Sequence, residues 1–226
     1  MKNLTTAVLA FALTAGAVSV QAQQTEISAN VNLVNDYKFR GISQTDRNRA
    51  LQGGFDYNHE SGAYAGVWAS TIEFADNIEM NYYAGFAGSL TSTVGYDVGV
   101  LVFEYPGLSA LDTVEVYGAL NYAGFTGKVS YTDSYFSTRG HAYYWDLGYG
   151  AELAQNLTLD LHVGLTDAQR DLFGSKNDYL DYGVSLGTAV FGLDFSAGLI
   201  ATNVSKGNCG SNACGGRAIF SVGKSF

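Results

Sequence analysis

The chain has 226 residues with 21 acidic and 12 basic side chains, and its formal net charge of −9 at pH 7 argues against binding to nucleic acid. Its mean hydropathy of +0.03 would be unusual for a bundle of membrane-spanning helices. A single proline and 16 tyrosines instead favour long strands, because proline cannot donate to a sheet and tyrosine gathers in the interfacial girdles of membrane barrels.

The N-terminal 22 residues have the pattern of a secretory signal peptide. Lys2 precedes an apolar run, and Val20-Gln21-Ala22 forms a small-residue cleavage site. A membrane anchor helix is the alternative, but threonine, glycine and serine interrupt the run. We therefore expect a signal peptide over 1–22 and one exported domain over 23–226, located in the bacterial outer membrane.

Apolar and polar side chains alternate from Ile27 to Arg40, which is the period of a β-strand. The face predicted to meet lipid carries Ile27, Ala29, Val31, Leu33, Tyr37 and Phe39. Asp36, Lys38 and Arg40 lie on the opposite face, which is predicted to meet water. We expect this strand to leave the barrel at its outer rim near Arg40, and residues 41–48 to form the first exposed loop.

The same period recurs along the whole chain, in twelve segments. They cover 26–40, 49–59, 62–74, 78–89, 93–105, 112–122, 125–136, 141–153, 157–167, 177–188, 191–203 and 216–226. Short connections tend to alternate with longer polar ones, as periplasmic turns and outer loops do in outer-membrane barrels. We predict an all-β fold, an antiparallel transmembrane β-barrel of about 12 strands, with ten or fourteen as alternatives. A soluble β-sandwich competes with it, but would use more proline and needs no terminal aromatic residue.

Charged residues fall mainly on the face predicted to line the lumen. The acids are Asp36, Asp56, Glu79, Asp97, Glu115, Asp146, Glu152, Asp160, Asp181 and Asp194, and the bases are Lys38, Arg40, Lys128 and Arg217. This excess of carboxylates predicts a lumen that attracts cations. The alternative is a network of acids, bases and tyrosines that fills the interior, as in many small barrels. Tyr83, Tyr117, Tyr144 and Tyr179 are the inward rings expected to obstruct a water-filled path.

The predicted outer loops carry basic residues and a pair of cysteines. Arg47, Arg49, Arg139, Arg170, Lys176 and Lys206 could contact the phosphorylated lipid of the outer leaflet, lipopolysaccharide included, or could be solvated loop residues. Cys209 and Cys214 predict a disulfide that restricts the last loop, since the protein is exported and no further cysteine or nearby histidine completes a zinc site.

An enzyme is not expected. Of the three histidines, only His162 lies beside a carboxylate on one strand face, that of Asp160, which is the spacing of an acid-oriented base. This resembles the Asp-x-His pair of the omptin proteases, but it falls in the predicted periplasmic half of its strand, and a lumen histidine with satisfied hydrogen bonds is the simpler interpretation. No metal, nucleotide or energy-coupling motif is visible, so we expect no cofactor and passive flux of small polar solutes.

The chain ends on an alternating strand that places Phe226 last, which resembles the signature by which the barrel-assembly machinery recognises outer-membrane barrels. Residues 31–47, VNLVNDYKFRGISQTDR, and the stretches ALQGGFDY and SGAYAGVWAS resemble the TorF-type porin family of proteobacteria. That resemblance implies an outer-membrane location and a pore, without a known solute. A closed structural or adhesive barrel and, less favoured, a lipid-directed or proteolytic enzyme are the alternatives to a cation-preferring channel.

Overall fold

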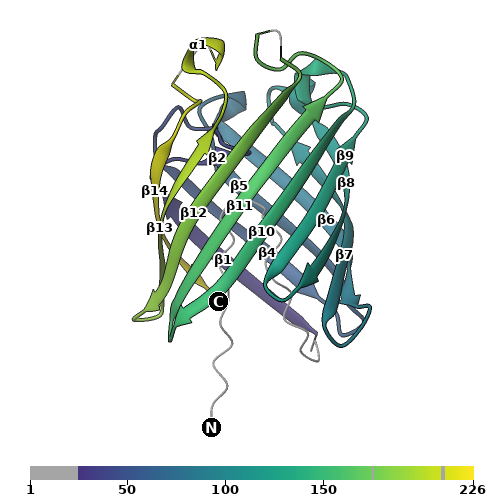
Figure 1. The fold of residues 1–226 in the computed structure, drawn as a ribbon, viewed down its shortest axis with the longest axis vertical. Helices are drawn as coiled ribbons and strands as arrows, with labels where there is room; N and C mark the ends of the chain where they lie inside the picture. The colour runs from purple at the N-terminus through teal and green to yellow at the C-terminus, as the bar shows by residue number, and fades with distance from the viewer. Residues whose placement is uncertain (1–24, 175, 210–211) are drawn as a thin grey trace.

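The computed structural model describes residues 25–174, 176–209 and 212–226. The predicted signal peptide lies outside the described residues. In the described part, twelve antiparallel strands form a closed barrel (Figure 1). They are β1 (Glu26–Val34), β4 (Ala50–Asn58), β5 (Ala63–Thr71), β6 (Ile78–Ser89), β7 (Val94–Glu104), β8 (Thr113–Tyr122), β9 (Phe125–Thr132), β10 (Ala142–Ala154), β11 (Leu157–Ala168), β12 (Asp178–Val190), β13 (Leu193–Thr202) and β14 (Arg217–Ser225).

The barrel closes because β1 pairs on both sides. Leu33 lies opposite Leu51 of β4 and opposite Val222 of β14, and every other strand pairs with its neighbours along the chain. The predicted fold class, an all-β antiparallel barrel with twelve strands, is confirmed. Within the described residues, no helix is long and apolar enough to span a membrane.

The two ends of the barrel differ. At one end, called the turn end, tight connections such as Ala123–Gly124 and Phe191–Gly192 join the strands, and β14 finishes there. At the other, called the loop end, lie the longer connections with η1 (Ala75–Asn77), η2 (Ser109–Leu111), η3 (Phe136–Thr138) and α1 (Lys206–Cys209). This asymmetry follows the predicted alternation of short and long connections, with two corrections. The strands predicted to reach residues 74 and 136 end at Thr71 and Thr132, so these two outer connections are longer than predicted.

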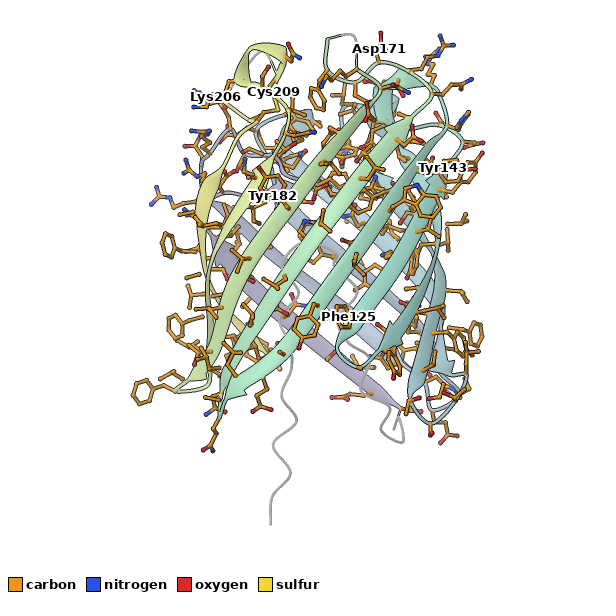
Figure 2. The ribbon with its side chains drawn as sticks, in the orientation of Figure 1. Phe125, Tyr143, Asp171, Tyr182, Lys206 and Cys209 are labelled. Carbon is orange, nitrogen blue, oxygen red and sulfur yellow. A yellow bond between two sulfur atoms is a disulfide. The ribbon has the colours of Figure 1, made fainter. Side chains whose placement is uncertain are left out.

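Alternation along each strand separates an apolar outer wall from a polar inner one. In β8, Leu120 is 54% exposed on the outside, whereas Glu115 is 2% exposed on the inside. Aromatic side chains gather near both ends of the outer wall, as in Phe125 and Tyr149 at the turn end, with ring centroids 4.7 Å apart. Tyr131 and Tyr143 form a similar pair, 5.0 Å apart, toward the loop end (Figure 2). The outer wall thus has the banded character of a lipid-facing surface.

The first strand is shorter than predicted. β1 ends at Val34, and Asn35 bonds with β14 through Phe220 N–H and the Ala218 carbonyl. Residues 35–49, named here the inward segment, then fold into the lumen and form the hairpin of β2 (Lys38–Phe39) and β3 (Ile42–Ser43). Predicting Tyr37 and Phe39 to face lipid was therefore wrong, as was placing Arg40 at the rim.

The inward segment is buried partly because an apolar cluster lies beside the buried charges in the loop-end half of the lumen. Tyr37 and Val34 join a core cluster that includes side chains from β7 and β14, namely Leu101, Phe103 and Ile219. The stretch 65–74, ambiguous in sequence, contributes Trp68 to this cluster, and its ring lies 5.4 Å from that of Tyr37. A small barrel whose interior is filled by side chains gains stability from such packing.

Candidate functional site

The lumen is the candidate site, and the inward segment is its main occupant. Arg40 reaches across to β8, where Nη2 donates to both carboxylate oxygens of Glu115 at 2.8 and 2.7 Å. Its guanidinium also lies 4.0 Å from the centroid of the Tyr144 ring on β10. Burial alone would lower the pKa of Arg40, but the Glu115 carboxylate raises it above the usual value, so Arg40 keeps its charge.

Asp36 organises the near side of the inward segment. Its Oδ1 accepts hydrogen bonds from the hydroxyls of Ser43, at 2.5 Å, and Thr45, at 3.0 Å. Its Oδ2 lies 3.2 Å from Nε of Arg217 on β14 and 3.9 Å from Nζ of Lys38. Burial lowers the pKa of Lys38, and the Asp36 charge opposes that shift. The segment is therefore folded on itself around one buried carboxylate.

Gly41 lies where the hairpin turns against the opposite wall. Its φ of +77° is in the left-handed region, and a Cβ there would lie 2.7 Å from Cβ of Asp181. Glycine meets both requirements, since it tolerates positive φ and leaves room for close approach. With contacts to β8, β10, β12 and β14, the inward segment extends across the full width of the lumen.

The last loop fastens the inward segment from the loop end. Cys209 and Cys214 are joined by a disulfide. The Ala213 carbonyl accepts from Lys38 Nζ at 2.9 Å and from the Ser43 N–H at 3.0 Å. Arg47 donates through Nε to the Asn212 carbonyl at 2.7 Å and through Nη2 to that of Cys214 at 3.3 Å. Three consecutive carbonyls thus hold the inward segment, and Arg47 is engaged in this contact rather than free for lipid.

A histidine bridges two inward acids in the middle of the barrel wall. His162 Nδ1 lies 2.9 Å from Asp146 Oδ1, and its Nε2 lies 2.8 Å from Asp181 Oδ1. No hydrogen bond joins it to Asp160 in the part of the chain that the structure describes, so the Asp-x-His pair considered from the sequence does not form. An imidazole fixed by carboxylates on both nitrogens has no lone pair left to act as a base. The trio is a structural crosslink between β10, β11 and β12.

The turn-end half of the lumen is lined differently. Glycines recur on its inward face, and the acids there, Asp56, Asp97, Asp160 and Asp194, are only partly buried, while Glu152 is exposed. A Cβ on Gly66 would overlap the Tyr83 ring, and Cβ atoms on Gly85 and Gly99 would overlap the rings of Tyr64 and Tyr117. In the loop-end half, a Cβ on Gly164 would likewise overlap the Tyr144 ring. Three of the four rings expected to obstruct the lumen therefore lie flat against its wall.

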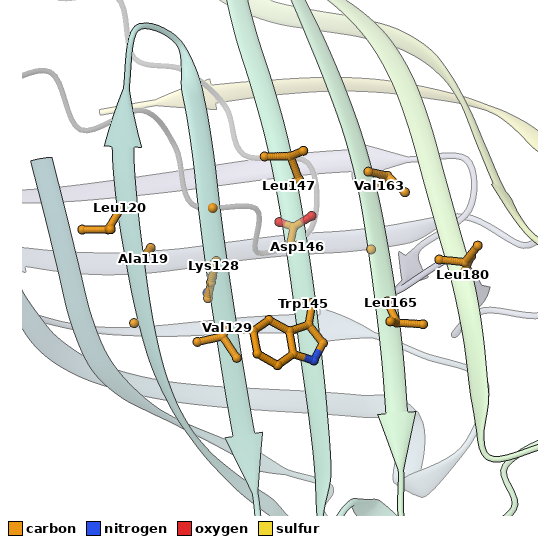
Figure 3. Close-up of a pocket in the computed structure, with 13 residues that line it drawn as sticks. Ala119, Leu120, Lys128, Val129, Trp145, Asp146, Leu147, Val163, Leu165 and Leu180 are labelled. Atoms are coloured by element: carbon orange, nitrogen blue, oxygen red, sulfur yellow. The ribbon is translucent and has the colours of Figure 1, made fainter. Parts of the chain in front are cut away.

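A separate hollow of about 610 Å³ lies on the outer wall (Figure 3). It is lined mainly by outward side chains of β8 to β12, among them Leu120, Val129 and Trp145, around Gly127, beside which a Cβ would meet no atom within 4 Å. The inward-facing residues Ala119, Lys128 and Asp146 also border it. Because most of these side chains are apolar and face lipid, we do not count the hollow as part of the lumen.

Comparison with known proteins agrees with this geometry. Residues 19–226 match the family described as "Bacterial protein of unknown function (Gcw_chp)". The chain belongs to this family. No curated protein matches the sequence.

Solved structures similar to this Gcw_chp barrel include small porins. The NanC porin superposes with a TM-score of 0.58 at 11% identity, covering 88% of this chain and 98% of that one. The KdgM porin gives 0.57 at 11% identity, covering 88% and 99%. KdgM in complex with disordered oligogalacturonate gives 0.57 at 9% identity, covering 88% and 98%. At these identities the likeness shows a porin-like outer-membrane barrel fold and nothing about the solute.

The predicted charges of this Gcw_chp chain divide into two groups. Asp36, Glu79, Glu115, Asp146 and Asp181 are buried with Lys38 and Arg40 in the loop-end half, where they pair with one another, with His162 or with Tyr37. The acids of the turn-end half have no basic partner within hydrogen-bond distance among the described residues. The predicted list omitted Trp68 and Phe103, which pack on the inward segment, and Gly41, at which that segment turns, and the alternation of apolar and polar residues carried no signal for them.

Proposed function

We propose that this protein is an outer-membrane channel for passive diffusion of small polar solutes, with a preference for cations. The observation that carries the proposal is the division of the lumen: a half lined by glycines and partly exposed acids leads to a constriction made by one chain segment. Acids outnumber bases along this lumen, so it should concentrate cations and repel anions. We propose no chemical reaction and no cofactor, so that flux follows the gradient.

The inward segment is the proposed determinant of pore size. It is held mainly by side-chain contacts to the strands and to the disulfide loop, rather than by pairing with the barrel sheet. We therefore expect a small conductance in the native protein, which rises when those contacts are removed. The solute should differ in charge from oligogalacturonate, the ligand of the KdgM structure, because such a polyanion would meet unpaired carboxylates.

Contacts with the membrane belong to the same proposal. The exposed loop bases Arg49, Arg139, Arg170, Lys176 and Lys206 would contact phosphorylated lipid, including lipopolysaccharide. Phe226 is 71% exposed at the turn end, where the assembly machinery would bind it.

Reversal potential in planar bilayers under a KCl gradient tests the charge argument. A double variant, Glu152→Gln with Asp160→Asn, removes two turn-end charges and should shift the reversal potential toward zero. Glu60→Gln with Asp171→Asn removes two exposed charges outside the lumen and serves as the matched control, with little expected shift. Anion preference in the native protein would contradict the proposal.

A closed structural barrel is the second candidate, and the apolar cluster in the loop-end half favours it. It predicts no conductance from a folded native barrel, nor from one in which the inward segment has been released. The two candidates are therefore separated by the same recording.

A further inference from the structure

Tyr64 and Tyr117 present two neighbouring aromatic rings to the lumen, Tyr64 in the turn-end half and Tyr117 farther in, where it also packs against the loop-end core cluster. Tyr64 of β5 lies directly opposite Gly85 of β6, and Tyr117 of β8 lies opposite Gly99 of β7. Each ring covers the glycine that it faces, since a Cβ there would overlap it. One face of each ring is therefore against the backbone, and the other is turned toward the lumen. Both side chains remain partly exposed.

A carboxylate lies where these two rings meet. Tyr64 Oη donates to Asp97 Oδ1 at 2.6 Å, and the Tyr64 and Tyr117 hydroxyls are hydrogen-bonded to each other. Asp97 is partly exposed and has no basic side chain within ion-pairing distance in the described part of the chain. The wall thus combines π faces with a carboxylate that forms no direct ion pair among the described residues, although the Lys128 ammonium interacts with it electrostatically. Aromatic faces and carboxylates are the two features that recognise organic cations.

An ammonium group already occupies part of this surface. Lys128 of β9 places Nζ 4.1 Å from the centroid of the Tyr117 ring. The face of the Tyr117 ring thus already accepts an ammonium group like that of an amine ligand. Among the described residues, no basic side chain lies over the Tyr64 ring. Tyr83 and Asp56, which are hydrogen-bonded on the neighbouring strands, extend the same ring-and-acid pattern around the wall.

We propose that Tyr64, Tyr117 and Asp97 form a binding site for an organic ammonium ion that enters the lumen from the turn end. The inference rests on the proposed function and names its solute class: small amines or quaternary ammonium compounds rather than inorganic cations alone. Binding is measurable without conductance, so a failure of this inference is distinguishable from a failure of the channel proposal.

The test is calorimetric titration of tetramethylammonium chloride into the refolded protein in uncharged detergent, with sodium chloride as the comparison salt. Native protein should bind tetramethylammonium saturably. Asp97→Asn and Tyr64→Leu should each weaken binding at least about fivefold, which corresponds to ~1 kcal/mol. Tyr64→Phe keeps the ring and should lose less than Tyr64→Leu. Circular dichroism of each variant verifies that the barrel has folded.

Two further variants distinguish specific binding at Tyr64, Tyr117 and Asp97 from general electrostatic attraction of cations into the lumen. Asp194→Asn removes the same charge from a position whose strand partners are Ala189 and Gly223, neither of which carries a ring, and should change affinity less than about twofold. Lys128→Met removes the competing ammonium and should tighten binding. Absence of saturable binding, equal losses in Asp97→Asn and Asp194→Asn, or weaker binding in Lys128→Met would each overturn the inference.

Discussion

Removing the charge of Arg40 should abolish much of the stabilising free energy that keeps the inward segment inside the lumen. The ion pair with Glu115 is deeply buried, with side-chain exposures of 7% and 3%, so solvent screens it little. Removing one partner of a buried pair costs about 3–5 kcal/mol, because the other charge is left uncompensated. We therefore expect Arg40→Met and Glu115→Gln each to lower the unfolding free energy by about that amount.

The double variant gives the sharper result. With both charges absent, the remaining cost should be mostly the lost packing of the guanidinium on the Tyr144 ring, up to about 2 kcal/mol. The double-mutant cycle should then give a coupling energy of at least about 2 kcal/mol in guanidinium titrations in detergent. Arg139→Met, at an exposed loop position, is the control and should stay within about 0.5 kcal/mol of native. Additive single effects below about 1 kcal/mol would refute the anchoring role of the pair.

Three other substitutions test the rest of the architecture. His162→Gln should destabilise the barrel by about 3 kcal/mol or more in the same titration, since it leaves two buried carboxylates without their bridging cation. Val184→Arg should lower stability by about 2–4 kcal/mol because that side chain faces lipid, whereas Ser185→Arg, one residue along and facing the lumen, should cost less. Cys209→Ser should accelerate amide exchange in residues 43–47 as the disulfide loop loosens, and unchanged exchange would contradict its role in fastening the inward segment.

The alternation of apolar and polar residues was enough to predict the barrel, because lipid favours apolar side chains and the lumen favours polar ones. Leu161 and Val163 must face outward if Asp160 and His162 face inward, and a shift by one residue would expose charges to lipid. Most turns and loops could also be predicted from the sequence, since tight turns and long loops differ in length and polarity. The predicted strand ends were wrong where the alternating pattern of apolar and polar residues continues beyond the last residue paired in the barrel sheet, as it does after Val34.

The position of the inward segment could not be predicted, because its alternating apolar residues could pack either against lipid or inside the barrel. Tyr37 and Phe39 alternate with Asp36 and Lys38 as in a lipid-facing strand, yet the apolar cluster inside the barrel accepts the same rings. Their partner Phe103, 5.4 Å from Phe39, lies far away in the sequence. The tyrosine rings that lie flat on glycines could not be predicted either, because only the register of strand pairing shows which glycine each ring covers.

The most direct test of the account is the single-channel conductance of a variant in which residues 36–48 are replaced by a short glycine-serine linker. Val34 and Ala50 are already paired across β1 and β4, so the shortened connection leaves the barrel sheet intact. If the inward segment is the constriction of a cation-preferring pore, conductance should rise well above the native value while the reversal potential keeps its sign. A folded variant with unchanged conductance, or with none, would contradict the central claim.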